Sequence, residues 1–102
     1  MIARLWHGRV PAAKAAAYRA FLVERAIPDY RAVAGNLGVR ILERREGDIV
    51  HFQTLTFWAG LSAIHAFAGR DATIAKYYAE DADFLLEMEE RVQHWDVVAA
   101  DP

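Results

Sequence analysis

Hydrophobic and polar residues along the chain follow two periods, which predicts a mixture of strands and helices. Residues 2–9 are apolar and aromatic with polar interruptions, a pattern typical of a strand. Residues 12–26 are rich in alanine and other strong helix formers. Within them Tyr18, Phe21 and Leu22 follow the three-to-four spacing of a buried helical stripe. The first quarter of the chain therefore predicts a strand followed by a helix.

Proline and glycine mark the expected breaks. Because the residue before a proline avoids the helical region, Ile27-Pro28 predicts an interruption of this helix, with a short turn resuming at residues 29–31. The stretch Ala-Gly-Asn-Leu-Gly at residues 34–38 is the plainest break. Gly47-Asp48 predicts a tight hairpin between two strand-like runs. These runs are residues 39–46 and 49–58.

The second half predicts two further helices and a last strand. The expected elements are a helix at 61–68 ended by Gly69, a helix at 72–78 capped by Asp71, a solvated acidic turn at 80–83 and a strand at 92–99. The order is strand, helix, strand, strand, helix, strand. This order indicates an α+β fold of the ferredoxin-like βαββαβ type, with an antiparallel sheet and helices on one face.

Apolar residues at both parities of the strands predict a partner for the sheet. The chain has 102 residues, which suits one domain spanning 1–102, and 55% of them are hydrophobic. Leu5 lies beside Trp6, and Leu55 has the opposite parity to Phe52, so both faces of the sheet carry large apolar side chains. We therefore expect the face without helices to meet a second copy in a homodimer.

Charge and composition exclude other classes of protein. The net charge is −2 and no basic block is interleaved with aromatics, so nucleic-acid binding is not expected. The chain has no cysteine, and no pair among its 4 histidines has the helical spacing of a metal motif, so we expect no metal site. No apolar run approaches the roughly 18 residues of a membrane span. A soluble cytoplasmic protein without a signal peptide is the expectation.

Short stretches over nearly the whole chain carry a family resemblance. They are residues 2–9, 27–30, 35–39, 54–58, 64–69 and 76–78 together with Asp81. They resemble the antibiotic biosynthesis monooxygenase family, most specifically in the strand ending at Phe57-Trp58, the following short helix and the pair Tyr77-Tyr78. The resemblance implies a dimeric α/β barrel in which two ferredoxin-like sheets close against each other.

The family resemblance implies mixed chemistry. Some members oxidise aromatic phenols with dioxygen and no cofactor, and others oxidise quinols, degrade haem or have no known activity. Trp58 matches a tryptophan that lines the family's pocket. The asparagine that accompanies it in the phenol oxidisers is missing around residues 6–8. Haem-degrading members use a histidine where this chain has Lys76-Tyr77-Tyr78, which counts against haem degradation.

Candidate site residues follow from chemistry and from the resemblance together. Trp58 would stack on a flat ring, His7 would accept a phenolic proton, and Tyr77 would hold a substrate oxygen. The further candidates for substrate binding are Trp6, Tyr30, His65 and Tyr78. Each also has an ordinary interpretation: a core tryptophan, a structural or solvated histidine, or a tyrosine at the edge of the core.

Two functions of different classes stay open. One is cofactor-independent oxidation of an aromatic phenol or quinol by dioxygen. The other is a non-catalytic ligand-binding or stress-related dimeric module whose cleft is filled by its own side chains. A dry slot beside Trp58 favours the first, and a cleft packed shut favours the second.

Overall fold

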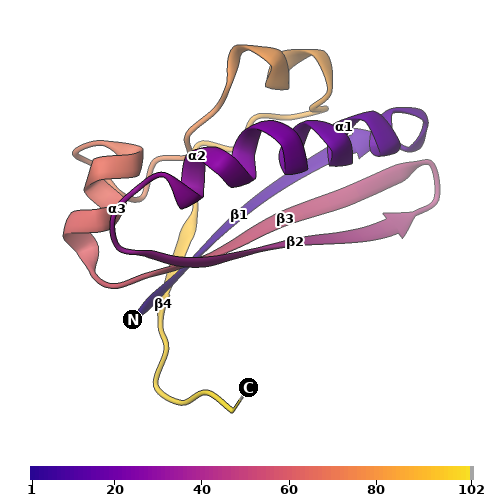
Figure 1. Cartoon of the computed structure of the whole chain (residues 1–102). Coiled ribbons are helices and arrows are strands. Elements are labelled where there is room, and N and C mark those ends of the chain that lie inside the picture. Colours follow the sequence, from indigo (N-terminus) through magenta and orange to yellow (C-terminus); the bar gives the residue numbers. More distant parts are fainter. Residues whose placement is uncertain (102) are drawn as a thin grey trace.

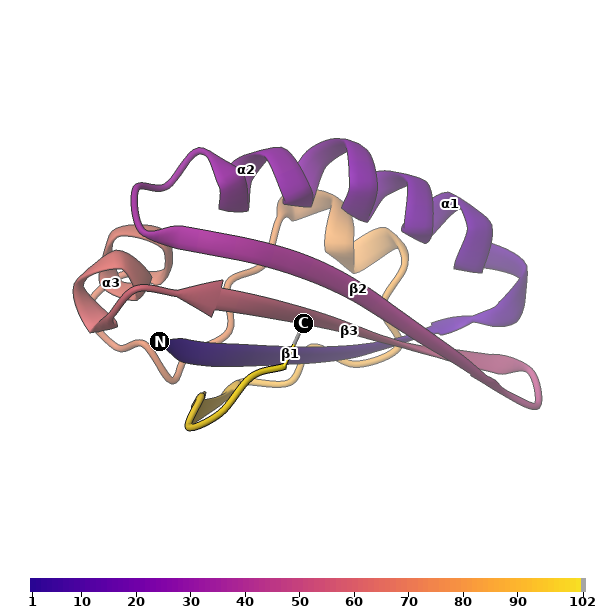
Figure 2. The same cartoon turned by 60° about the horizontal axis from the view of Figure 1, so that its bottom comes forward.

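The computed structural model describes residues 1–101 as an α+β fold with one antiparallel sheet of four strands. The strands are β1 (Ile2–Pro11), β2 (Asn36–Glu46), β3 (Ile49–Trp58) and β4 (Gln93–Asp96), in the order β2-β3-β1-β4. The main helices are α1 (Ala15–Phe21), α2 (Ile27–Arg31) and α3 (Leu61–Ala68), and they cover one face of the sheet (Figures 1 and 2). This confirms the α+β class and is compatible with a ferredoxin-like arrangement.

The sheet forms from the segments that the sequence predicts as strands. Each residue of β1 pairs with one of β3, from Ile2 opposite Trp58 to Pro11 opposite Ile49. The predicted hairpin at Gly47-Asp48 joins β2 to β3, and Gly47 has a φ of 60°, which glycine adopts without strain. Strand β4 is shorter than predicted, since only Gln93–Asp96 of residues 92–99 pair with β1.

Two faces of the sheet have different surroundings. The helix face carries Arg4, Trp6, Val10, Phe52, Thr54, Thr56 and Trp58, all buried. We call the opposite side the open face; by the alternation of the strands it presents Leu5, His7, Arg9, Leu42, Arg44, His51, Gln53, Leu55, Phe57 and Trp95. Figure 2 shows no helix on this side.

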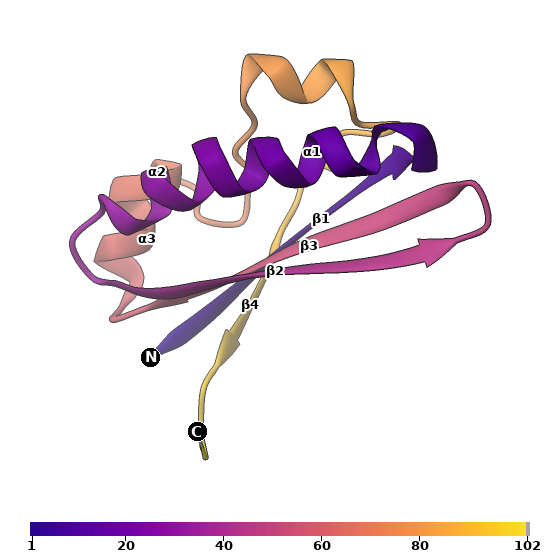
Figure 3. The same cartoon turned by 45° about the vertical axis from the view of Figure 1, so that its right-hand side comes forward.

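The helix after β1 runs through Pro28, so the predicted interruption is wrong. A 3-10 turn, η1 (Ala12–Lys14), leads into α1, and a π-helical stretch, η2 (Leu22–Ala26), joins α1 to α2. The N–H of Ile27 donates to the carbonyl of Leu22, five residues earlier. The wider turn places Pro28 in the first turn of α2, where a missing N–H costs little. Figure 3 shows the resulting run of helix along the sheet.

The predicted helix at 72–78 is also wrong. Residues 71–73 form a turn in which Asp71 accepts from the N–H and the hydroxyl of Thr73. Ile74 then pairs with Arg91 in an antiparallel bridge, and the N–H of Ala75 donates to the carbonyl of Glu90. Pairing with the segment before β4 takes the backbone groups that a helix would use. The acidic turn becomes a 3-10 helix, η3 (Ala79–Asp83).

No helix of the described chain is long and apolar enough to cross a membrane.

Gly8 gives the first testable prediction, because its missing side chain makes room for Trp6. A Cβ at this position would lie 2.5 Å from Cη2 of Trp6 and 2.8 Å from Cδ2 of Leu85. We expect Gly8→Ala to lower the free energy of unfolding by about 1–3 kcal/mol, as overpacking does. The same substitution in a Trp6→Phe background should cost less, since the crowding atoms are gone. Equal costs in both backgrounds, measured by denaturant unfolding, would contradict this explanation.

Candidate functional site

A small slot lies between the helix face and the helices. It is lined by Trp6, Tyr18, Leu22, Ala26, Tyr30, Thr54, Lys76, Tyr78 and Asp81, and its free volume is about 10 Å³. That is space for about one water molecule. Three of the predicted binding residues, Trp6, Tyr30 and Tyr78, therefore share one site, but the aromatic side chains nearly fill it.

Asp81 is the carboxylate of this slot. It is 3% exposed, and it is the one carboxylate among the buried residues of the described chain. Its Oδ1 accepts from the hydroxyl of Tyr18 at 2.8 Å, and its Oδ2 accepts from the backbone N–H of Tyr78 at 2.7 Å. Burial nevertheless raises the pKa of Asp81, while both hydrogen bonds act in the opposite direction. The prediction of a solvated acidic turn is wrong for this residue.

The tyrosines of the slot are held as neutral hydrogen-bond donors. Burial is the main cause that raises the pKa of Tyr18, and the charge of Asp81 raises it further. Burial also raises the pKa of Tyr30, whose hydroxyl lies 3.1 Å from Oγ1 of Thr54. Tyr78 donates to Asp29 at 2.7 Å, and burial followed by this hydrogen bond raises its pKa. These groups orient polar atoms around the slot without adding charge.

Positive charge stands beside the slot. Arg4 is 1% exposed, and its guanidinium lies over the ring of Phe67 with 5.6 Å to the centroid. One of its nitrogens donates to the carbonyl of Ile74, its Nε has no partner, and no carboxylate of residues 1–101 pairs with it. Lys76 lies 4.3 Å from the centroid of the same ring. A buried cation without a counter-charge favours an anionic group nearby.

Trp58 is a core residue in this structure. It is 0% exposed, lies 5.5 Å from the ring of Phe67 and 6.4 Å from that of Tyr30, and donates to Oγ1 of Thr56 at 2.8 Å. It does not line the slot. Because it is fully covered, it offers no ring face to a substrate.

Trp58 is also separated from the other two predicted catalytic residues. His7 follows Trp6 in β1 and so points to the open face, whereas Trp58 points to the helix face. Tyr77 donates to the carbonyl of Glu89 and packs edge-on against Trp6 at 6.1 Å. The structure therefore does not bring His7, Trp58 and Tyr77 into one site.

His65 lies outside the slot as well. It is exposed on α3, and its Nδ1 donates to the carbonyl of Gly69 at 2.9 Å. That hydrogen bond helps to end the helix.

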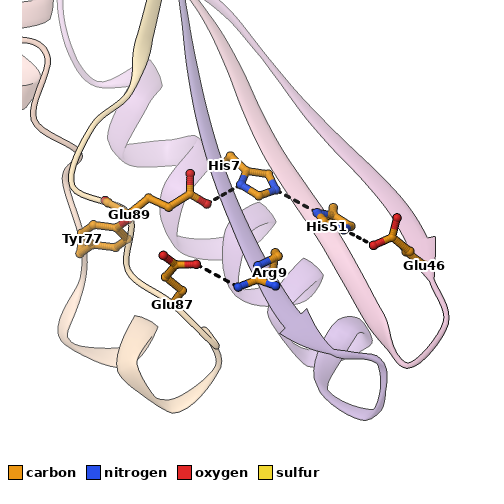
Figure 4. A network of polar contacts seen from close by, with 7 residues as sticks. All are labelled: His7, Arg9, Glu46, His51, Tyr77, Glu87 and Glu89. Carbon is orange, nitrogen blue, oxygen red and sulfur yellow. Dashed lines mark hydrogen bonds and ion pairs between the residues drawn. The ribbon is translucent and has the colours of Figure 1, made fainter.

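A second polar group occupies the open face. His7 and His51 come from neighbouring strands, and Nε2 of His7 lies 3.0 Å from Nδ1 of His51. Nδ1 of His7 contacts Glu89 at 2.5 Å, and Nε2 of His51 contacts Glu46 at 3.3 Å. Figure 4 shows this row of four side chains, with the ion pair between Arg9 and Glu87 beside it.

Comparison with known proteins supports the fold and gives no information about the chemistry. The chain matches the crystal structure of NE2512, a protein of unknown function from Nitrosomonas europaea, with a TM-score of 0.69 at 18% identity, over 99% of this chain and 92% of that chain. At this identity the match shows a shared fold alone. No family model matches the chain, and no curated protein matches it either. The resemblance to the antibiotic biosynthesis monooxygenase family therefore stays a prediction.

The buried Asp81 gives a prediction about stability and pH. Its pKa is raised on folding, so the native state holds this proton more tightly than the unfolded chain does. The stability that Asp81 contributes is therefore fully present below the ordinary carboxyl pKa of about 3.9 and is lost as the pH rises through the raised native value. As the pH rises over this range, we expect the free energy of unfolding of the wild type to fall relative to that of Asp81→Asn. Asp83→Asn, an exposed neighbour in η3, is the matched control; a parallel pH profile for wild type and Asp81→Asn would contradict the assignment.

Proposed function

We propose that the protein binds a small phenol or quinol in the slot between the helices and the sheet. The observation that carries this proposal is the buried Asp81–Tyr18 pair in an aromatic slot. Burial raises the pKa of this carboxyl, and a carboxylate with a raised pKa is a stronger base toward a phenolic proton. Lys76, which lines the slot, and Arg4, which lies with it against the ring of Phe67, would stabilise the phenolate that results.

Oxidation by dioxygen is the reaction proposed for that ligand. After Asp81 takes the first proton, the electron-rich ring passes two electrons, one after the other, to dioxygen. For a quinol the balance is quinol plus dioxygen giving quinone plus hydrogen peroxide, so that both protons end on the peroxide. The substrate supplies both electrons, and the protein binds the ring, moves the proton and limits access of water.

A second candidate function is a binding module without catalysis, which the small volume of the slot favours. At about 10 Å³ the slot does not admit a ring until the segment of residues 74–83, which brings Lys76, Tyr78 and Asp81 to the slot, moves outward. Polar contacts hold that segment in place, among them Tyr18 to Asp81, Lys76 to the carbonyl of Phe67 and Tyr78 to Asp29. Under either candidate function, a ligand can therefore bind only after this segment opens locally.

Oxygen uptake distinguishes the two functions. We expect the wild type to consume dioxygen with a hydroquinone or an anthrone, and Asp81→Asn to lose about 10²–10⁴-fold in rate, the usual contribution of a general base. Asp83→Asn should keep the wild-type rate. Binding of these phenols without oxygen uptake would select the non-catalytic module. If the wild type shows no binding and no oxygen uptake with any of these phenols, the proposed site is refuted.

We also propose that the protein acts as a homodimer, through the open face, in a barrel of two sheets. Leu42 and Trp95 are 42% and 61% exposed there, with Leu5, Leu55 and Phe57 beside them. Arg40 and Arg44 lie on β2 at one edge of the sheet, and Glu87 and Glu89 lie beyond β1 toward the other. A twofold axis parallel to the strands would set the β2 edge of each copy, with Arg40 and Arg44, against the side of its partner that carries Glu87 and Glu89.

Sedimentation tests the dimer. We expect twice the chain mass of 11.5 kDa at micromolar concentration. Trp95→Arg or Leu42→Arg should weaken association by roughly 30-fold or more, as loss of a large apolar contact and burial of a charge do. Leu61→Arg is the matched control, because Leu61 is 53% exposed but lies on α3, away from the open face. A stable single subunit in the wild type would overturn the dimer.

A further inference from the structure

Arg4 is a buried cation that adjoins the slot on the helix face. It is 1% exposed and lies on β1 two residues before Trp6, which lines the slot. Residues two apart on a strand point to the same face, about 7 Å from each other. Burial raises the pKa of Tyr30, another lining residue, and the charge of Arg4 acts in the opposite direction, as expected for a cation near that hydroxyl.

Most of the hydrogen-bonding capacity of Arg4 is unused within residues 1–101. Its Nη2 donates to the carbonyl of Ile74 at 3.1 Å, its Nε has no partner, and no carboxylate of this range pairs with it. Opposite Arg4 on β4, Nε2 of His94 is likewise buried without a partner. Burial and then the charge of Arg4 lower the pKa of His94, so this ring adds no second charge. Buried polar atoms in this condition favour an acceptor beside Arg4.

The charges around the slot do not balance. Of the residues that line it, Lys76 and Asp81 carry charge, and Arg4 beside it makes two cations to one carboxylate. A neutral phenol leaves one positive charge over. When Asp81 takes the phenolic proton, its negative charge passes to the ligand and the excess stays the same. A ligand with one further, permanent negative charge balances the site before and after the proton moves.

We propose that the phenol or quinol bound in the slot carries a carboxylate on its ring, and that Arg4 together with Lys76 receives this carboxylate. The inference names the substrate class of the slot and so rests on the proposed function. The carbonyl of Ile74 belongs to the segment of residues 74–83 that has to open. Opening withdraws that carbonyl and frees Nη2, which forms one edge of the guanidinium with Nε. Such an edge holds both oxygens of a carboxylate.

Binding of two matched quinols, measured by calorimetry in the absence of oxygen, tests the carboxylate. Gentisate is a hydroquinone with a carboxylate on its ring, and gentisamide is its neutral analogue of nearly the same shape. We expect the wild type to bind gentisate about 10–100-fold more tightly than gentisamide, as a charge-assisted hydrogen-bonded pair does. The ratio of the two affinities isolates the carboxylate, because both ligands share the ring and its hydroxyls.

The variants locate the preference. Arg4→Gln should bring the two affinities close to each other, and Arg4→Lys should keep part of the preference, since the charge stays while the paired donors are lost. Lys76→Gln should lower the ratio by a smaller factor; this residue is exposed, so the variant decides the test if the Arg4 variants do not fold. Arg45→Gln is the matched control, because it removes an exposed cation at the hairpin end of β2.

Equal affinities in the wild type would overturn the inference, as would a preference that is unchanged in Arg4→Gln and Lys76→Gln. Absence of binding by both ligands would overturn it together with the site. Oxygen uptake with unsubstituted hydroquinone separates it from the proposed reaction. Uptake without a preference for gentisate rejects the carboxylate and keeps the oxidation, whereas an Arg4-dependent preference without uptake keeps the carboxylate and rejects the oxidation.

Discussion

The pleat of β1 is the constraint on which both the slot and the histidine row depend. Successive side chains of a strand point to opposite faces, so Trp6 enters the core while His7 beside it reaches the open face. The full-length pairing of β1 with β3 extends this division across the middle of the sheet. His7 therefore cannot act as a base beside the buried ring of Trp6. The sheet instead separates a tyrosine–carboxylate slot from a histidine–carboxylate row.

The elements that the sequence predicts well are those whose pattern is local. Strand β3, the Gly47-Asp48 hairpin and α3 each carry their own periodicity or turn residues, and each was predicted within a few positions. The errors lie where distant partners decide. Residues 72–78 became extended because Ile74 pairs with Arg91, and the helix passed Pro28 because a π turn preceded it. Neither a bridge partner nor a π turn leaves a signal in a short window.

The site was predictable only in part, for a similar reason. Side-chain chemistry and the family resemblance together marked Trp6, Tyr30 and Tyr78, which do share the slot. Asp81 was placed in solvent because acidic turns usually are, and its burial depends on Tyr18, 63 positions away. The parity of β1 alone could have placed His7 away from Trp6. The pairing of His7 with His51, in contrast, required the register between β1 and β3, which the sequence does not specify.

Asp81 and Arg4 are both buried on the helix side, yet they do not form an ion pair with each other. Asp81 accepts from Tyr18, and Arg4 donates to the carbonyl of Ile74. Desolvation acts on both, raising the pKa of Asp81 and lowering that of Arg4. An apolar pair of similar volume would fill the same space without this cost, so the charges are not required for packing alone. Arg4 lies on β1, which pairs with β3 over its whole length, whereas Asp81 lies in a segment whose regular structure is limited to η3 and one bridge. In the proposed function, a ligand would enter between the charge on the sheet and the carboxylate of this segment after a local opening of the segment.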